Sequence, residues 1–227
     1  MSGSLFQAYA DRDACVAGLA IELAECLRQA QSAGARARLL LPGGTSPQAL
    51  LPHLARRSLD WSRLDLSPGD ERWVPRDDPQ SNYRLLQQGL PAAACLDPRQ
   101  APAAEQAVQR WGERLREWLP FSAVLLGMGE DGHIASLFPG MPELAAALDI
   151  DDAPATLLVH TDTEPRLRLS ANLALLLNTG WLGLLAFGER KKRLIYAALA
   201  GQPATRELPL HALLHNGRRA VHIHWAP

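Results

Sequence analysis

The stretch that decides the fold runs from Leu125 to Gly140 and reads LLGMGEDGHIASLFPG. It opens at the end of an apolar run, residues 123–126, which has the length of a buried β-strand. Glycines follow at positions 127, 129 and 132, and glycine permits positive φ angles and a close approach of the backbone to a ligand. The stretch therefore predicts a buried strand that ends in a glycine-rich loop.

This loop carries two titratable side chains, Asp131 and His133. An imidazole changes its charge near neutral pH, so a histidine at the carboxyl end of a buried strand is well placed to act as a general base. A tight turn whose side chains bond only to the backbone fits the same residues equally well. The loop by itself therefore leaves a catalytic and a structural interpretation open.

The overall composition is typical of a globular protein. The chain has 227 residues, of which 47% are apolar and 21% charged, enough to bury a sizeable core in one domain over residues 1–227. The formal net charge is −1, so no global attraction to nucleic acid or to an anionic membrane is expected. Any binding of anions must come from a local cluster of charges.

Cysteines and the N-terminus indicate the expected compartment. The three cysteines, Cys15, Cys26 and Cys95, form no CxxC pair, which argues against a disulfide framework or a zinc site. No basic segment followed by an apolar one opens the chain, and no apolar run approaches the ~20 residues of a membrane span. We therefore expect a cytoplasmic protein without a signal peptide, a metal or a membrane partner.

Strand patterns alternate with helix patterns along the chain. Helices are predicted over residues 11–31, 48–54, 81–88, 103–119, 170–178 and 189–200, and strands over residues 38–41, 123–126, 157–160, 181–187 and 220–224. This alternation predicts an α/β fold, with a mostly parallel Rossmann-like sheet flanked by helices on both faces in a single domain. Ligands of such sheets bind outside the carboxyl ends of the strands.

A second glycine-rich loop precedes the helix predicted over residues 48–54. Gly43 and Gly44 are followed by Thr45 and Ser46, and free backbone amides with two hydroxyls make a suitable cradle for a phosphate. The loop lacks the lysine of a Walker motif and is not a GxGxxG sequence. A plain helix start capped by a hydroxyl fits these residues about as well.

Further charged residues follow other elements. Asp70, Glu71 and Arg72 form a charged turn, and arginine can hold a phosphate through two parallel hydrogen bonds. Without the other loops, a salt-bridged surface turn is the better interpretation. Arg166 precedes an apolar run, and Lys191 follows a glycine after the strand predicted over residues 181–187. Cations in such positions are better ligand candidates than cations in mid-helix.

Taken together, these loops resemble the 6-phosphogluconolactonase family. Five motifs occur in the family's order: GGTSP at residues 43–47, DERWVP at 70–75 with SNY at 81–83, GMGEDGHIASLFP at 127–139, PR at 165–166 and GERK at 188–191. The resemblance implies a carboxylic ester hydrolase of the oxidative pentose phosphate pathway. Its expected substrate is the sugar-phosphate lactone 6-phospho-D-glucono-1,5-lactone, and no cofactor is required. We expect a monomer or small homo-oligomer without a nucleic-acid partner.

The resemblance also implies a role for each matching residue. His133 is the expected general base, and Asp131 is expected to orient it or to bind sugar hydroxyls. The expected substrate-binding residues are Gly43, Gly44, Thr45, Ser46, Asp70, Arg72, Arg166 and Lys191. Their cations and the loop amides would hold the phosphate, and backbone amides of residues 129–132 would stabilise the oxyanion.

Two other functions are alternatives. The related glucosamine-6-phosphate deaminases share the first glycine loop and the DGH core, but typically continue with an FNEP-like segment where this chain has SLFP at residues 136–139. They also favour Asp-Glu-Tyr where this chain has Asp-Glu-Arg at residues 70–72. A non-catalytic sugar-phosphate-binding regulator would carry a basic DNA-binding segment, which is not evident here.

Three positions depart from the family pattern. Thr45 and Ser46 stand where the family usually has Ser-Thr, and both hydroxyls are kept. Pro68 precedes Gly69 where the family has an apolar strand end; proline cannot donate a ladder hydrogen bond, so we expect this strand to stop early and displace the Asp70 loop. Arg168 stands where the family has threonine, and it either adds a cation to the site or points away.

Overall fold

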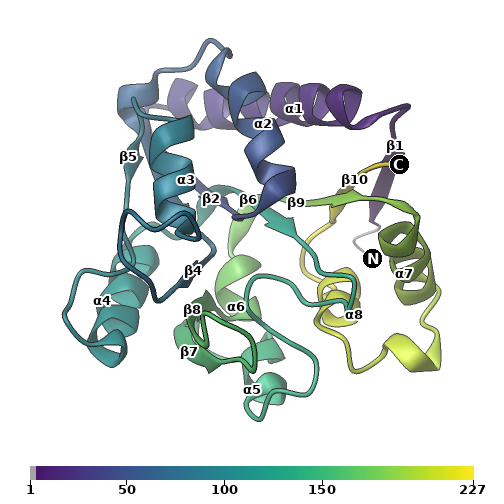
Figure 1. Ribbon diagram of the computed structural model, residues 1–227. Helices are drawn as coiled ribbons and strands as arrows, with labels where there is room; N and C mark the ends of the chain where they lie inside the picture. The colour runs from purple at the N-terminus through teal and green to yellow at the C-terminus, as the bar shows by residue number, and fades with distance from the viewer. Residues whose placement is uncertain (1–3) are drawn as a thin grey trace.

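A seven-stranded parallel sheet forms the centre of the molecule in the computed structural model, which describes residues 4–227 (Figure 1). The strands lie side by side in the order β1 (Leu5–Ala8), β10 (His222–Ala226), β9 (Thr179–Phe187), β6 (Phe121–Gly127), β2 (Ala37–Leu41), β3 (Leu64–Pro68) and β5 (Ala94–Cys95). All the neighbouring pairs are parallel. The predicted α/β class with a mostly parallel sheet is therefore confirmed.

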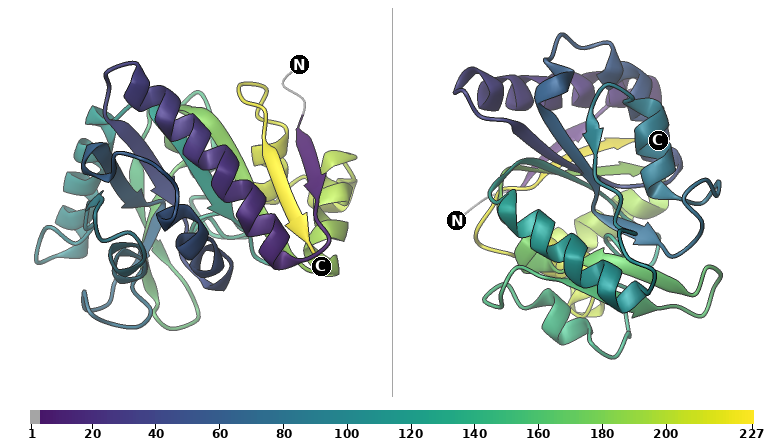
Figure 2. Two further views of the ribbon diagram at one scale, coloured as in Figure 1. Left: turned by 90° about the horizontal axis from the view of Figure 1, so that it is seen from above. Right: turned by 90° about the vertical axis from the view of Figure 1, so that its left-hand side faces the viewer.

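Each central strand contributes to two hydrophobic cores, because successive side chains of a strand point to opposite faces. In β2, Leu39 and Leu41 belong to one core and Leu40 to the other. One face is covered by α1 (Arg12–Ser32), α2 (Thr45–Ala55) and α3 (Asn82–Gly89). The other is covered by α4 (Ala104–Glu117), α5 (Leu144–Leu148), α6 (Leu173–Leu176), α7 (Glu189–Leu199) and α8 (Pro209–Leu214) (Figure 2). Two short 3-10 helices, η1 (Trp61–Arg63) and η2 (Pro203–Thr205), lie in connections.

The helix starts follow from local capping. Asp11 precedes α1 with an extended backbone, and its side chain accepts a hydrogen bond from the Ala14 amide at 2.8 Å. Ser81 caps α3 in the same way by accepting from the Arg84 amide at 3.1 Å. The long α1 buries a row of apolar side chains against the sheet, from Val16 to Leu27. These two helices lie within a residue or two of their predicted ranges.

A second, smaller sheet lies below the first in Figure 1 and was not predicted. It is antiparallel and contains β4 (Asp70–Arg72), β8 (Leu167–Ala171) and β7 (Thr156–His160) in that order. The helix predicted over residues 170–178 is wrong at its start, because β8 continues to Ala171. A short helix, α6, begins only after Asn172, whose side chain accepts from the Leu175 amide at 2.9 Å.

The strand before Asp70 does not stop early, which corrects the expectation from Pro68. β3 runs to Pro68, which pairs with Leu41 at the end of β2. The Gly69 amide then donates to the Leu41 carbonyl at 3.1 Å, and the Gly69 carbonyl accepts from the Ala171 amide at 3.1 Å. Because Pro68 is the last residue of β3, its missing N–H interrupts no pairing, and Gly69 links the two sheets.

The strand order reverses between β2 and β6. From β2 the chain proceeds to β3 and β5 on one side, and from β6 it proceeds to β9 and β10 on the other. The loops that leave the carboxyl ends of β2 and β6 therefore diverge and leave a crevice, the usual ligand site of such sheets. These are the two glycine-rich loops of the sequence. No helix among residues 4–227 has the length and apolarity needed to cross a membrane.

Candidate active site

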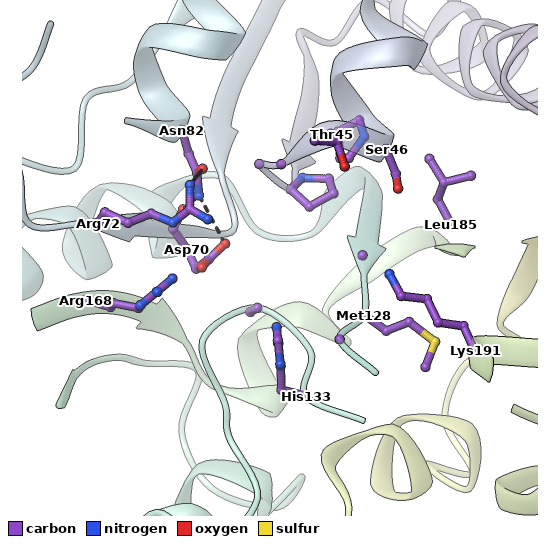
Figure 3. A pocket seen from close by; sticks show the side chains of 17 residues that line it. Thr45, Ser46, Asp70, Arg72, Asn82, Met128, His133, Arg168, Leu185 and Lys191 are labelled. Carbon is purple, nitrogen blue, oxygen red and sulfur yellow. Dashed lines mark hydrogen bonds between the residues drawn. The ribbon is translucent and has the colours of Figure 1, made fainter. Parts of the chain in front are cut away.

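A cavity of about 230 Å³ lies at the point where the strand order reverses (Figure 3). It is lined by residues 42–47 after β2, Asp70 and Arg72 of β4, Asn82 of α3, residues 127–129, His133 and Ala135 from the loop after β6, Arg168 of β8, Leu185 of β9 and Lys191 of α7. Its size and its many polar groups fit one small polar molecule.

His133 and Asp131 form a pair at the edge of this cavity. The Asp131 Oδ1 atom lies 2.7 Å from His133 Nδ1 and also accepts from the His133 amide at 3.2 Å. The His133 ring is tilted against the Phe138 ring, with centroids 4.6 Å apart, and its side chain keeps 30% of its surface exposed. A carboxylate at Nδ1 selects the tautomer that carries its proton there, which leaves Nε2 free to accept one.

The glycines of this loop make the Asp131–His133 pair possible. A Cβ atom on Gly129 would lie 2.3 Å from both Asp131 Oδ1 and His133 Nδ1, so a side chain at that position would push one of the two out of place. The Gly129 amide donates to the His133 carbonyl at 3.0 Å, and the Gly132 amide donates to the Gly129 carbonyl at 3.3 Å. Gly132 has a φ of +85°, which favours glycine.

The second glycine loop brings backbone amides to the opposite wall. Gly44 has a φ of +97° and precedes α2, whose first helical hydrogen bond joins the Gln48 amide to the Gly44 carbonyl at 3.1 Å. The amides of Thr45 and Ser46 therefore have no partner within the helix. A Cβ atom on Gly43 would lie 1.7 Å from Asn82 Oδ1, so glycine is required where this loop meets α3.

Asn82 ties the charged turn of β4 to this wall. Its Nδ2 atom donates to the Asp70 carbonyl oxygen at 2.7 Å and lies 3.3 Å from Asp70 Oδ1, while its Oδ1 accepts from Arg72 Nη1 at 2.8 Å. Asp70 Oδ2 accepts from the Ser136 hydroxyl at 2.6 Å. The SNY motif contained the signal for Asn82, but sequence reasoning did not assign it to the site.

Glu71 holds the same turn from behind. Its carboxylate is fully buried and accepts from the backbone amides of Arg72, Asn82 and Tyr83 at 2.7–2.8 Å. Arg99 Nη1 lies 3.3 Å from Glu71 Oε2. Burial raises the pKa of Glu71, and the Arg99 charge and these amide hydrogen bonds oppose that shift. Glu71 therefore fixes Arg72 and Asn82 without lining the cavity itself.

The structure corrects one of the expected cations. Arg166 does not line the cavity; it lies just before β8, pairs with Glu164 at 3.0 Å and is 72% exposed. Arg168 lines the cavity instead. Pairing of β8 begins at Leu167 opposite His160, so Arg166 belongs to the hairpin end and Arg168 to the sheet. The second of the two possibilities left open for Arg168, that it points away, is therefore excluded.

The remaining expected residues meet in one place. The sequence-predicted residues Gly43, Gly44, Thr45, Ser46, Asp70, Arg72, His133 and Lys191 all line the cavity. Asp131 stands behind His133. Burial lowers the pKa of Lys191, which the negative charge of Glu130 opposes. No group of three or more histidine, cysteine or acidic residues within 4–227 is arranged to hold a metal ion.

Comparison with known proteins gives consistent results for nearly the whole chain. A model of the family described as glucosamine-6-phosphate isomerases/6-phosphogluconolactonase matches residues 10–225. The chain is 37% identical to a 6-phosphogluconolactonase of Pseudomonas putida, over 96% of this chain and 91% of the relative. It is also 37% identical to one of Pseudomonas aeruginosa, over 92% of this chain and 90% of the relative.

A solved structure agrees with the fold. A 6-phosphogluconolactonase from Shewanella baltica superposes with a TM-score of 0.90 at 29% sequence identity, covering 99% of this chain and 98% of the other. The similarity therefore extends over both sheets and the cavity between their loops.

Proposed function

The chain belongs to the glucosamine-6-phosphate isomerase/6-phosphogluconolactonase family, and from this premise we propose that it hydrolyses 6-phospho-D-glucono-1,5-lactone to 6-phosphogluconate in the oxidative pentose phosphate pathway. The lactonase branch is favoured over the isomerase branch by the names of its relatives, which are 6-phosphogluconolactonases. The observation that carries the proposal is the Asp131–His133 pair at the edge of a cavity that also holds three cations, Arg72, Arg168 and Lys191.

In the proposed reaction His133 acts as the general base. Nε2 takes a proton from water while the water oxygen bonds to C1 of the lactone, and the carbonyl oxygen becomes an oxyanion. When this intermediate collapses, the bond between C1 and the ring oxygen breaks, and the imidazolium returns its proton to that oxygen. The Asp131 carboxylate stabilises the imidazolium between these two steps and keeps the ring oriented.

The phosphate is held by charge and by backbone amides. Arg72 and Lys191 supply positive charge, and the unpaired amides of Thr45 and Ser46 stand at the N-terminus of α2. Fixing the phosphate holds the lactone carbonyl in place near His133 and reduces the entropic barrier. Asp70, in the same wall, is proposed to accept a hydrogen bond from a sugar hydroxyl.

Fewer backbone amides are available to stabilise the oxyanion than the sequence indicated. Two amides of the loop, those of Gly129 and Gly132, already donate to loop carbonyls. Within residues 129–132, the amides of Glu130 and Asp131 are therefore those proposed to bind the oxyanion.

The proposal is tested by hydrolysis of freshly generated 6-phosphogluconolactone, followed against the spontaneous reaction. We expect rapid turnover by the wild type and a decrease of roughly 10²-fold or more for His133→Ala, with substrate binding largely kept. Glucono-1,5-lactone, which lacks the phosphate, serves as the control substrate and should react poorly.

Two outcomes would contradict this function. Near-normal turnover by His133→Ala would remove that residue as the base. No acceleration by the wild type, together with release of ammonia from glucosamine 6-phosphate, would assign the chain to the isomerase branch of its family instead.

A further inference from the structure

A buried ion pair lies behind the charged turn of β4, outside the cavity. Arg99 belongs to the connection after β5, in a segment that none of the five sequence motifs includes. Its side chain keeps 8% of its surface exposed and places Nη1 3.3 Å from Oε2 of the fully buried Glu71. No other cation within residues 4–227 forms an ion pair with Glu71. The buried carboxylate therefore depends on one arginine for its counter-charge.

Arg99 is itself held by partners on several segments. Its Nη2 donates to the Ser81 hydroxyl at 3.0 Å and lies 3.1 Å from Asp97 Oδ1. The same Asp97 oxygen accepts from the Arg99 amide at 3.0 Å. Nη1 also donates to the carbonyl oxygens of Arg72 at 3.5 Å and Val74 at 3.4 Å. The guanidinium therefore joins the start of α3 to the chain that leaves β4.

Glu71 extends these contacts to the wall of the cavity. Its Oε1 accepts from the amides of Arg72 and Asn82, and its Oε2 accepts from the amide of Tyr83. The side chains of Arg72 and Asn82 are hydrogen-bonded to each other and line the cavity (Figure 3), which Arg99 does not. A protonated carboxyl group carries a donor on one of its oxygens, and both Glu71 oxygens face an amide. The amide hydrogen bonds therefore depend on the negative charge of Glu71.

Burial works against that charge. It raises the pKa of Glu71, and the positive charge of Arg99 is the largest effect that opposes the shift, followed by the amide hydrogen bonds. Removing one partner of a buried ion pair leaves the other charge uncompensated. Without Arg99, the pKa of Glu71 should therefore rise further, and the carboxylate should gain a proton at a higher pH.

The other titratable groups near Glu71 do not replace Arg99. They are Asp70 and Arg72 of β4, Arg76 of the following loop, Tyr83 of α3, and Cys95 with Asp97 at the end of β5 and just after it. Arg76 pairs with Asp97 at 3.7 Å. The pKa of the Cys95 thiol is raised to about 12, mainly by burial, so this group stays neutral. From β8, the residue opposite Glu71 is the apolar Leu169.

We propose that Arg99 is a positioning residue of the active site, which neutralises Glu71 from behind the charged turn and so holds Arg72 and Asn82 in place for the phosphorylated ligand. The inference rests on the proposed function and adds to it a residue that does not contact the ligand. Because Arg99 acts through a titratable carboxylate, its loss should make ligand binding sensitive to pH.

Calorimetric titration with 6-phosphogluconate tests this role without turnover. The wild type, Arg99→Gln and Arg114→Gln are compared at about pH 6 and about pH 8.5. The ligand's own ionisation affects all three proteins alike, so the quantity to compare is the ratio of each variant's Kd to that of the wild type. Arg114 is the matched control, because it is an exposed arginine of α4.

The loss of affinity in Arg99→Gln should depend on pH. We expect binding about 10-fold weaker than that of the wild type at about pH 6, where Glu71 is protonated in the variant. At about pH 8.5, where Glu71 is ionised again, the loss should be much smaller. Arg114→Gln should bind like the wild type at both pH values. Unchanged affinity in Arg99→Gln, or a loss of equal size at both pH values, overturns the proposal, because Arg99 would then only brace the turn.

The conservative variant Arg99→Lys provides a second test, also where Arg99→Gln does not fold. It keeps the positive charge with fewer donors, so any loss of affinity should be the same at both pH values. A loss that grows towards low pH in Arg99→Lys would overturn the role assigned to the charge.

A measurement without ligand separates this proposal from the proposed function. Carbon-13 NMR of the Glu71 carboxyl carbon, assigned by its absence in Glu71→Gln, should show titration at a higher pH in Arg99→Gln than in the wild type. Identical titration overturns the proposal whatever the enzyme does. An active wild type with identical titration in Arg99→Gln overturns the positioning role alone. An inactive wild type overturns the proposed function, and the NMR titration still decides whether Arg99 keeps Glu71 ionised.

Discussion

At the scale of single residues, the charged groups of the cavity are positioned by neighbours that stand behind them. Asp131 holds His133, Asn82 holds Arg72, and buried Glu71 holds the backbone of both Arg72 and Asn82. Because all these contacts are made within the protein, they hold the binding groups in a defined orientation. Such preorganisation lowers the cost of reaching the reactive geometry.

The surroundings of a second histidine, His224, lower its pKa and so affect how the stability of the protein depends on pH. His224 lies on β10, fully buried, with Nδ1 2.9 Å from the Tyr9 hydroxyl and Nε2 3.4 Å from Glu22 Oε2. The pKa of His224 is lowered to about 4, mainly by burial; the negative charge of Glu22 opposes this shift, and the nearby His222 adds to it. The folded protein therefore keeps this ring neutral at pH values where the unfolded chain protonates it.

We predict that acid destabilises the protein through His224. As the pH falls from about 6.5 to about 5, His224 binds a proton in the unfolded state but stays neutral in the folded state. The free energy of unfolding therefore decreases by about 1.5 kcal/mol. Urea unfolding at both pH values measures this loss, and His224→Gln should remove most of it. An equal pH dependence in the variant would show that other groups are responsible.

Most of the expected residues that line the cavity belong to a distinctive glycine-rich or charged motif. The glycine spacing around Asp131 and His133 predicted a loop after a buried strand, and in the structure a loop follows β6 there. Arg166 and Arg168 are two residues apart and share strand parity, so the alternation of side chains does not distinguish them. Only the point where β8 begins to pair, at Leu167, decides that Arg168 reaches the cavity.

At the scale of the elements, apolar segments such as β6, β9 and the five-residue β7 were predictable, whereas the short polar strand β4 was not. The parallel strands β6 and β9 are apolar runs buried on both faces, which the sequence displays directly. β4 has only three residues and is polar, and its strand character comes entirely from pairing with β8. A segment whose structure is set by a distant partner carries no local signal of it.

The glycine loop after β6 gives a prediction at this scale. In Gly129→Ala the new Cβ would lie 2.3 Å from Asp131 Oδ1 and His133 Nδ1, so one partner must move and their hydrogen bond is lost. We expect kcat for the lactone to fall roughly 10-fold or more. Gly127→Ala, at the end of β6 just before this loop, is the comparison, since its Cβ would meet Pro42 only at 3.8 Å, and it should cost much less. Equal losses in both variants would show that the pair does not depend on Gly129.

At the scale of the whole molecule, the cavity lies between the two sheets and is lined by residues from both. The large sheet contributes the loops after β2 and β6, and the small sheet contributes Arg72 and Arg168. The wall residues come from positions 42 to 191, interleaved along the chain. Because β4 follows β3 after a single residue, Gly69, neither sheet can be separated as a continuous segment. The two sheets should therefore unfold together.

We predict one cooperative unfolding transition that shifts as a whole when 6-phosphogluconate binds. At a ligand concentration 100 times Kd the free energy of unfolding rises by about 2.7 kcal/mol, which raises the melting temperature by about 5–10 °C for a chain of this size. Tryptophan fluorescence reports on both cores, since Trp111 lies in one and Trp181 in the other, and far-ultraviolet circular dichroism reports on the helices. If the transitions followed by fluorescence and by circular dichroism coincide, both with and without ligand, they support a single domain over residues 1–227. Two transitions, only one of which shifts when ligand is added, would contradict it.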